Sequence, residues 1–260
     1  MDILGLGLPI TRTQYFDGLM GPTDIGGDDT VLWFDWTDKP TVVESSGNIE
    51  SISNKVTVTP WSTHILQAIG GTPVYSNLNG QNGFDFSSHL GGGQSYQLYD
   101  SGGNAVSVNY GENYTVAIIQ ENDLFGGGVS GITGGRNPNG YTFRWSGSAL
   151  IGTVYAQGGT ASDSINPQGT SENDFGIAVQ KVDNDNDEIS VRFNGDSNAA
   201  SAITGDPVNT VSSLFVGKAN NGTQYFTGKI YEFMFWKRVL TAEELTQLDT
   251  YVKTKYDFTF

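Results

Sequence analysis

The sequence predicts an all-β protein in which two antiparallel sheets pack face to face and a short helix closes the C-terminus. Glycine is abundant, at 35 of 260 residues, and charged residues make up 16%, a balance typical of many short strands joined by turns. The hydrophobic fraction of 37% is low for a helical protein. It suffices for a sandwich, because only the inward faces of the sheets are apolar.

The predicted strands begin at residue 30 and are separated by Gly, Asn-Gly and Asp signals. A nearly continuous apolar run at 114–120 indicates a strand buried on both faces, and the acidic stretch 183–187 indicates a hairpin turn. In the run 229–236 both alternating sets of side chains are apolar, so we expect both faces of that strand to be covered. The clearest runs are TVLWFDW (30–36), KVTVTPW (55–61), YTVAIIQ (114–120), GYTFRW (140–145), DFGIAVQKV (174–182), EISVRFNG (188–195), LFVGK (214–218) and KIYEFMFW (229–236).

The chain ends in a predicted helix whose start is well specified. Thr241 can cap this helix, and Glu244 completes a capping box, while Leu240 and Leu245 form a hydrophobic staple. Apolar side chains then recur at helical spacing, namely Leu245, Leu248, Val252 and Tyr256. We expect the helix to lie flat on an apolar face of the sandwich and not to insert into a membrane.

Residues 1–29 differ from the rest of the chain, because they are rich in Gly and their scattered apolar residues follow no sustained period. Two interpretations are open: an arm that docks on a neighbouring protein, or a loosely draped N-terminus. The sequence shows no internal repeat and no interdomain linker. We therefore divide the chain into an N-terminal arm (1–29) and one domain (30–260).

The charge of the chain excludes several partners. The formal net charge is −15 and the Lys and Arg residues form no cluster, whereas a nucleic-acid-binding protein needs a basic stripe. An anionic membrane surface would repel this chain. The acidity indicates solubility or, alternatively, binding of divalent cations.

Several further features are missing from the sequence. There is no cysteine, which excludes disulfides, thiolate metal sites and a cysteine nucleophile. The N-terminus lacks the basic start and long apolar core of a secretory signal, and no run approaches the roughly 18 apolar residues of a membrane span. We expect a soluble protein without a visible export signal.

The C-terminal block GKIYEFMFWKRVLTAEELTQLDTYVKTKY (228–256) resembles the laminin-G-like, concanavalin A-like jelly-roll family. That family shows a Gly, a strand with an acidic residue, an R-x-L-[ST]-x-E-E link and a helix ending in Lys-Tyr. Weaker pieces follow the family pattern in order from about Thr30, namely LWFDWTD (32–38), GTPVYSNLNGQNGFDFS (71–87), YTVAIIQ (114–120), VRFNGD (191–196) and LFVGKANNGTQYFTGKI (214–230). The resemblance implies a two-sheet antiparallel jelly roll. It implies no single function, because the scaffold serves lectins, adhesins, glycan hydrolases and structural modules.

The sequence does not carry the catalytic pattern of glycan hydrolases that use this fold. Those enzymes resemble one another in an E-x-D-x-x-E strand that places two carboxylates beside the sugar bond. The nearest string here is Glu121-Asn122-Asp123, which lacks the second Glu. His64 and His89 lie in different segments and in no nucleophile motif. We therefore predict that the protein is not an enzyme.

One candidate metal site lies in the predicted hairpin at 183–187. Asp183, Asp185 and Asp187 alternate in this turn, and alternate carboxylates can converge on a hard cation such as Ca²⁺. The helix-loop-helix context, the glycine at position six and the acid at position twelve are absent. The alternative is an acidic turn that faces water.

One candidate carbohydrate site lies in NPNGYTFRW (137–145). Sugars present an apolar ring face and a polar edge, so their sites combine an exposed aromatic with nearby donors. Asn139, Tyr141, Arg144 and Trp145 supply these groups, and Trp61 offers a further aromatic. The alternative is that Tyr141 and Trp145 belong to the core.

These observations together favour a non-enzymatic surface protein of a virus particle, such as a bacteriophage capsid decoration or tail-fibre component. In this hypothesis the arm docks on virion structural proteins, the sandwich faces outward and binds host-surface glycans or stabilises the particle, and copies assemble as a homo-oligomer. Two alternatives stay open. One is a bacterial carbohydrate-binding module or glycan-active enzyme, and the other is a structural subunit without a ligand.

Overall fold

The structure is a computed structural model. It describes residues 20–71, 73–78, 81–86, 93–123, 129–134, 140–156, 159–167, 174–205, 211–219 and 224–260. Its helices are α1 (Pro22–Gly26) and α2 (Ala242–Tyr256), and single 3₁₀ turns lie at Gly27–Asp29, Lys39–Thr41 and Trp61–Thr63. None of the helices in these ranges has the length and apolar character that crossing a membrane requires.

One layer of strands, the helix-side layer, is centred on β20 (Gly228–Trp236). One edge of β20 pairs with β9 (Tyr114–Asn122), and its other edge is shared by β1 (Thr30–Asp35) and β6 (Gln81–Asp85). The layer continues outward from β9 and β6 through β14 (Asp174–Asp183), β15 (Glu188–Phe193), β16 (Asp196–Ser197), β17 (Ser201–Ala202) and β5 (Val74–Leu78).

The second layer, the open layer, contains the remaining long strands. Its order is β2 (Val42–Ser45), β3 (Asn48–Ser53), β4 (Ile65–Ala68), β7 (Tyr96–Tyr99), β19 (Phe215–Val216), β10 (Val129–Gly134), β11 (Gly140–Ser146), β12 (Ala149–Ala156) and β13 (Gly159–Ile165). A separate small ladder joins β8 (Ser107–Asn109) and β18 (Val211–Ser213).

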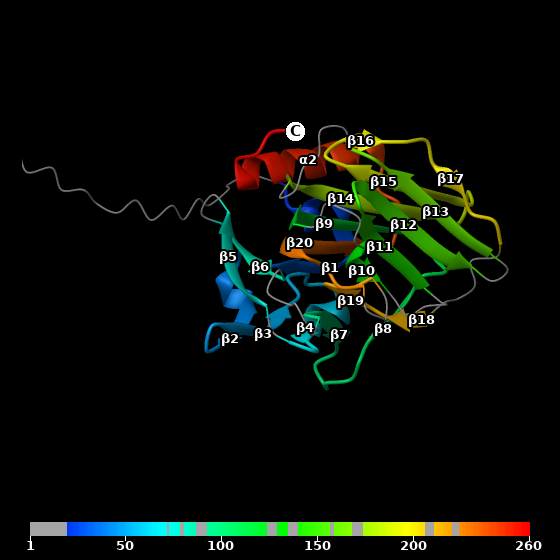
Figure 1. The fold of residues 1–260 in the computed structure, drawn as a ribbon. Coiled ribbons are helices and arrows are strands. Elements are labelled where there is room, and N and C mark those ends of the chain that lie inside the picture. The colour runs from blue at the N-terminus through cyan, green and yellow to red at the C-terminus, as the bar shows by residue number, and fades with distance from the viewer. Residues whose placement is uncertain are drawn as a thin grey trace, which may run out of the picture.

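The prediction of an all-β antiparallel protein with a short C-terminal helix is confirmed, as Figure 1 shows. The prediction of two separate sheets holds only in part. The pair Asn48–Val74 joins β3 to β5, so the 18 described strands of the two layers form one continuous sheet that folds over on itself.

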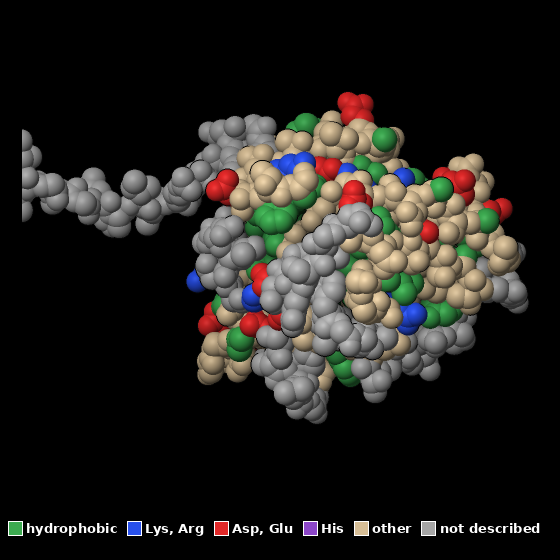
Figure 2. All heavy atoms as spheres, turned by 45° about the horizontal axis from the view of Figure 1, so that its top comes forward, with side chains coloured by type: hydrophobic (Ala, Val, Ile, Leu, Met, Phe, Trp, Pro, Cys, Tyr) green, Lys and Arg blue, Asp and Glu red, His purple; other side chains and the backbone are tan. Residues whose placement is uncertain are grey.

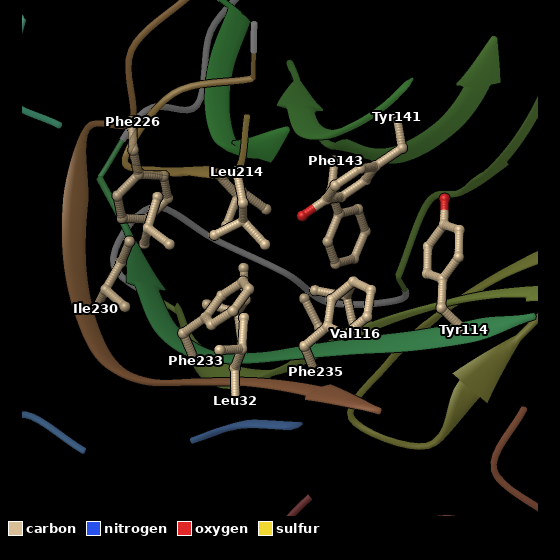
Figure 3. Close-up of a cluster of buried hydrophobic side chains, with 14 of the residues drawn as sticks. Leu32, Tyr114, Val116, Tyr141, Phe143, Leu214, Phe226, Ile230, Phe233 and Phe235 are labelled. Carbon is tan, nitrogen blue, oxygen red and sulfur yellow. The ribbon is translucent and has the colours of Figure 1, made fainter. Parts of the chain in front are cut away.

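The main core lies between the two layers. Figure 3 shows its centre, where Phe233 and Phe235 of β20 meet Tyr141 and Phe143 of β11. Aromatic rings pack edge-on or stacked through this region, as in Tyr114 against Phe235 with ring centroids 5.5 Å apart. Burial of such side chains stabilises a fold by roughly 1.5–3 kcal/mol each.

A second core lies between the outer face of the helix-side layer and α2, which Figure 1 shows lying over β14, β9 and β20. Leu245, Leu248 and Val252 of α2 pack there with Met234 and Trp236 of β20. The strand β20 is thus covered on both faces, as the sequence predicts. The capping box is also present, because the Thr241 amide donates to Glu244 Oε2 at 2.8 Å and the Glu244 amide to Thr241 Oγ1 at 3.3 Å.

Residues 22–29, which the sequence assigns to the arm, pack against the helix-side layer. Ile25 is buried in the second core, and Trp236 Nε1 donates to the Pro22 carbonyl at 3.3 Å. Arg238 joins this segment to α2, because its guanidinium contacts both Asp29, at 3.2 Å, and Glu244. Residues 1–19 of the predicted arm lie outside the described residues.

Candidate functional site

The predicted carbohydrate residues of β11 divide between two faces of the strand. Successive side chains of a strand point to opposite sides, and Tyr141 and Trp145 point into the main core with 0% and 1% of their surface exposed. These rings therefore present no face to solvent. Arg144 points the other way and is half-buried, and Asn139 lies outside the described residues.

The outer face of β11, β12 and β13, here called the β11–β13 face, carries small polar side chains around one aromatic and one cation. Cross-strand pairing places Arg144 beside Ile151, and Tyr155 beside Thr160. Thr142 and Thr153 are buried in its floor, whereas Thr160, Ser162 and Ser164 are exposed. The only acidic residue of these three strands, Asp163, points inward, where it accepts a hydrogen bond from the Val191 amide at 2.8 Å.

The β11–β13 face is bounded along β10 by backbone. The Ala219 amide donates to the Gln224 carbonyl at 3.1 Å, and this backbone pair lies against β10. A Cβ atom on Gly134 would be 1.8 Å from the Ala219 carbonyl oxygen, and one on Gly131 would be 2.2 Å from that of Gln224. Only glycine permits such close approach, so these two positions of β10 set the boundary of the face.

Arg144 is held at this boundary. Its Nη1 donates to Gln224 Oε1 at 3.3 Å. Its Nε is buried and has no hydrogen-bond partner, and within the described part of the chain no carboxylate pairs with it. The guanidinium is therefore oriented by an amide, and no described carboxylate neutralises its charge.

The metal prediction concerns the turn between β14 and β15, whose aspartates engage separate partners. Asp183 accepts from the Asn186 side chain at 2.8 Å, and Asp185 from the Asn113 side chain at 2.6 Å. Across the described ranges, no three acidic or histidine side chains gather as metal ligands. Calcium binding by Asp183, Asp185 and Asp187 stays a prediction.

A family model, described as the concanavalin A-like lectin/glucanases superfamily, matches residues 112–246, just over half of the chain. The chain belongs to this superfamily. The match includes β9, β11–β13 and the start of α2, so it covers the β11–β13 face and most of the C-terminal block that resembles the family. The weaker segments 32–38 and 71–87 lie outside the matched range.

The fold of this superfamily member is also similar to solved binding domains of toxins. The botulinum neurotoxin serotype D binding domain has a TM-score of 0.60 and 15% identity and covers 86% of this chain and 52% of its own. The binding domain of Paraclostridial Mosquitocidal Protein 1 has a TM-score of 0.59 and 13% identity, and the match covers 85% of this chain and 52% of that domain. The chain thus spans about half the length of these domains, and at this identity the likeness shows the fold alone. No curated protein matches the sequence.

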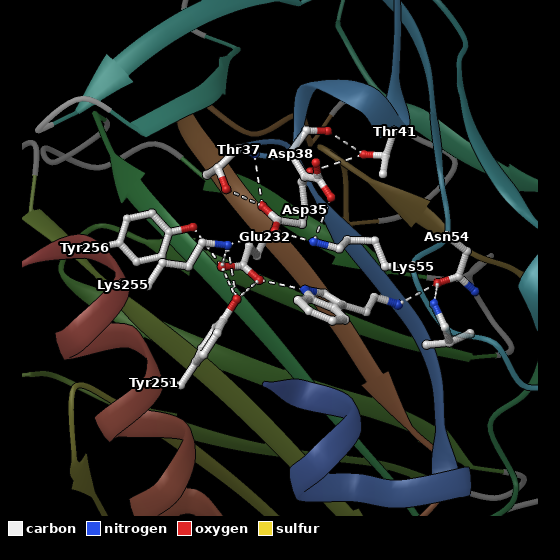
Figure 4. Close-up of polar contacts among 12 residues, drawn as sticks. Asp35, Thr37, Asp38, Thr41, Asn54, Lys55, Glu232, Tyr251, Lys255 and Tyr256 are labelled. Atoms are coloured by element: carbon white, nitrogen blue, oxygen red, sulfur yellow. Dashed lines mark hydrogen bonds and ion pairs between the residues drawn. The ribbon is translucent and has the colours of Figure 1, made fainter. Parts of the chain in front are cut away.

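The acidic residue of the superfamily-like C-terminal block lies in a buried polar cluster (Figure 4). Glu232 of β20 is 0% exposed and accepts hydrogen bonds from Trp33 Nε1 at 2.7 Å, from the Tyr251 and Tyr256 hydroxyls, each at 2.8 Å, and from Lys255 Nζ at 2.9 Å. Burial raises the pKa of Glu232, although the charge of Lys255 opposes that shift.

The other half of this cluster is Asp35 of β1. Lys255 Nζ lies 2.8 Å and Lys55 Nζ 3.0 Å from Asp35 Oδ2. Burial alone would raise the pKa of Asp35, but these two ammonium groups outweigh it and lower the pKa to about 2. Because Lys255 stands on α2, the cluster fastens the helix to β1 and β20.

No pattern in the sequence predicts this cluster as a unit. Its signals were the acidic residue within an otherwise apolar strand and the Lys-Tyr pair at the end of the helix. The members come from segments far apart in the chain, so no local pattern joins them. Its two carboxylates are buried and its lysines are half-buried, and every member bonds to another member, so the cluster serves to hold α2 on the sheet.

The other residues considered for catalysis, where the structure describes them, also make contacts within the fold. Glu121 points toward α2, pairs with Lys229 and accepts from the Tyr231 hydroxyl at 3.2 Å. His64 is buried against Trp61, with ring centroids 5.0 Å apart. His89 lies outside the described residues.

Proposed function

We propose that this member of the concanavalin A-like lectin/glucanases superfamily is a non-enzymatic glycan-binding protein whose ligand lies on the β11–β13 face. The observation that carries the proposal is the composition of that face. It joins exposed hydroxyl groups to a half-buried aromatic, Tyr155, and an oriented cation, Arg144. A sugar needs such an apolar plate beside polar donors and acceptors.

The chemistry of the same face argues against hydrolysis. Glycoside cleavage canonically uses two carboxyl groups that flank the scissile bond. The outward positions of β11, β12 and β13 carry no carboxylate, since Asp163 points inward. The face offers groups that bind a sugar and none that would act as acid or nucleophile.

The test uses a tyrosine on each side of the boundary. Tyr155→Ala should weaken glycan binding at least tenfold, because stacked area on the sugar is lost. Tyr99→Ala is the matched control: Tyr99 is also half-buried and points outward, but from β7, across β10 from the β11–β13 face. Binding is measured for the full chain on a glycan array and then by calorimetry, with and without Ca²⁺.

The outcomes of this test separate the proposal from its rivals. Equal loss in both variants would move the ligand away from the β11–β13 face. Silence of the wild type against the whole array would favour a structural subunit without a ligand. Release of shorter sugars from any polysaccharide would defeat the non-enzymatic assignment.

We propose further that the protein is displayed on a virus particle as a capsid decoration or tail-fibre component, where it binds virion proteins and assembles with copies of itself. The support is the sequence: a cysteine-free, acidic, Gly-rich sandwich behind a Gly-rich N-terminal segment. Adjacent genes for portal, capsid or tail proteins would support this setting. A neighbourhood of polysaccharide-utilisation genes would instead favour a bacterial carbohydrate-binding module.

A further inference from the structure

Arg144 is a half-buried cation in a protein of strongly acidic net charge. The chain carries a formal net charge of −15, and in Figure 2 the basic side chains on the visible face are few and separated by acidic and uncharged ones. Most half-buried cations in the described ranges pair with a carboxylate, as Lys55, Lys229 and Arg192 do. In the same ranges Arg144, like Lys181, Lys218 and Lys253, has no carboxylate partner, and its Nη1 donates to the amide oxygen of Gln224.

The described neighbours of Arg144 on the adjacent strands do not neutralise its charge. Its cross-strand neighbours are Gly131 and Ile151, which carry no charge. The exposed groups on β13, Thr160, Ser162 and Ser164, are neutral hydroxyls. A guanidinium has five N–H donors. Nε of Arg144 is buried, and Gln224 engages Nη1 without cancelling the charge, so the terminal Nη groups are the donors left for a ligand.

We propose that the β11–β13 face selects acidic glycans and that Arg144 binds their carboxylate. Guanidinium and carboxylate are matched for two parallel hydrogen bonds, and the hydroxyl groups of β13 and the ring of Tyr155 serve the neutral part of the sugar. This inference rests on the proposed glycan-binding function and adds the charge of the ligand.

The net negative charge of the protein does not prevent this recognition. At about 0.15 M salt the Debye length is about 8 Å, so distant acidic residues are largely screened, while a direct pair at a partly buried site is screened less. The outward positions of β11, β12 and β13 hold no carboxylate that would repel the ligand at short range.

The experiment compares a uronic-acid oligosaccharide with its carboxyl-reduced, neutral counterpart, by calorimetry on the full chain at about 0.15 M salt. We expect the acidic sugar to bind roughly tenfold or more tightly, in keeping with a charge-assisted hydrogen-bonded pair. Arg144→Gln should abolish that preference, so that the variant binds the acidic and the neutral sugar with similar affinity. Lys39→Gln makes the same change of net charge at an exposed site outside this face and should keep the preference.

Each result bears on a different claim. Equal affinity of the wild type for the two sugars, or a preference that survives Arg144→Gln, overturns the inference and leaves the proposed function standing. A preference lost equally in Lys39→Gln attributes it to net charge and also overturns the inference. No binding of either sugar, together with a silent array, overturns both. A parallel measurement with the carboxyl-reduced oligosaccharide after sulfation shows whether the site binds carboxylates alone or any anionic group.

Discussion

The outer face of the helix-side layer is sealed by α2, whereas the β11–β13 face of the open layer presents hydroxyl groups to solvent. Two strands show the contrast directly. Every residue of β9 is buried, since both of its faces are covered. In β13, from Thr160 to Ile165, exposed and buried residues alternate.

The charged side chains of the two faces also differ in their partners. Beneath α2, the buried carboxylates of Asp35 and Glu232 both pair with the half-buried Lys255. On the β11–β13 face Arg144 is half-buried and has no carboxylate partner in the described ranges. Buried charges that are not paired and hydrogen-bonded destabilise the fold. The pairing of Asp35, Glu232 and Lys255 therefore serves the stability of the protein. The proposed role of Arg144 in binding an acidic glycan rests on this contrast.

The largest expected effect comes from placing a charge under α2. Leu248 is fully buried against β9 and β20, so Leu248→Asp loses an apolar side chain and buries an unpaired carboxylate. We expect a loss of about 5 kcal/mol in unfolding free energy, or failure to fold. Ser162→Asp on the β11–β13 face should change stability by less than about 0.5 kcal/mol. Chemical denaturation measures both, and similar losses would contradict the contrast between the faces.

The next effect concerns the ion cluster. Lys255→Met removes the cation that joins Asp35 to Glu232 and leaves two buried carboxylates close together. Breaking a buried ion pair by removing one partner costs about 3 kcal/mol or more. Lys253→Met is the matched control, because Lys253 lies on the same helix and its ammonium group lies over the Phe260 ring instead of pairing with a described carboxylate. A double mutant with Glu232→Leu should recover part of the loss, and no recovery would mean that Lys255 acts by packing alone.

Low pH should weaken the attachment of α2 to the helix-side layer, and it should do so in a defined pH range. The pKa of Asp35 is lowered from 3.8 to about 2, so Asp35 contributes stability above about pH 4 that is lost as pH falls toward 2. The loss is about 2 kcal/mol. Glu232 acts in the opposite sense, because its raised pKa makes the folded state bind that proton more readily than the unfolded chain. Asp35→Asn should flatten the stability profile between pH 4 and 2; an unchanged slope there would assign the acid sensitivity to other groups.

Local patterns in the sequence predicted α2 and strands of both layers, but they did not single out β12 and β13 of the β11–β13 face. The run 55–61, predicted as a strand, is instead irregular and leads into the 3₁₀ turn Trp61–Thr63. The cap at Thr241 and the apolar spacing of α2 are encoded within a few residues, and they were confirmed. Successive side chains of β11 point to opposite faces, so Arg144 cannot share a face with Tyr141 and Trp145. The prediction that placed all three in one site did not take this alternation into account. Which face points inward depends on the opposing layer, which no local pattern reveals. The ion cluster joins residues about 200 positions apart, so its geometry follows only from the complete fold.

The smallest expected effect tests where the folded body begins. A chain that starts at Asp28 loses Pro22 and Ile25, which pack with Trp236 and α2. Burial of one isoleucine is worth about 1.5–3 kcal/mol, and the ordering of a few residues offsets part of it. We expect a loss of about 1 to 2 kcal/mol in unfolding free energy. A chain that starts at Met20 should keep full stability, since it retains every described contact of α1. If both truncations are equally stable, the segment 22–29 is not part of the seal under α2 and belongs functionally with the preceding residues.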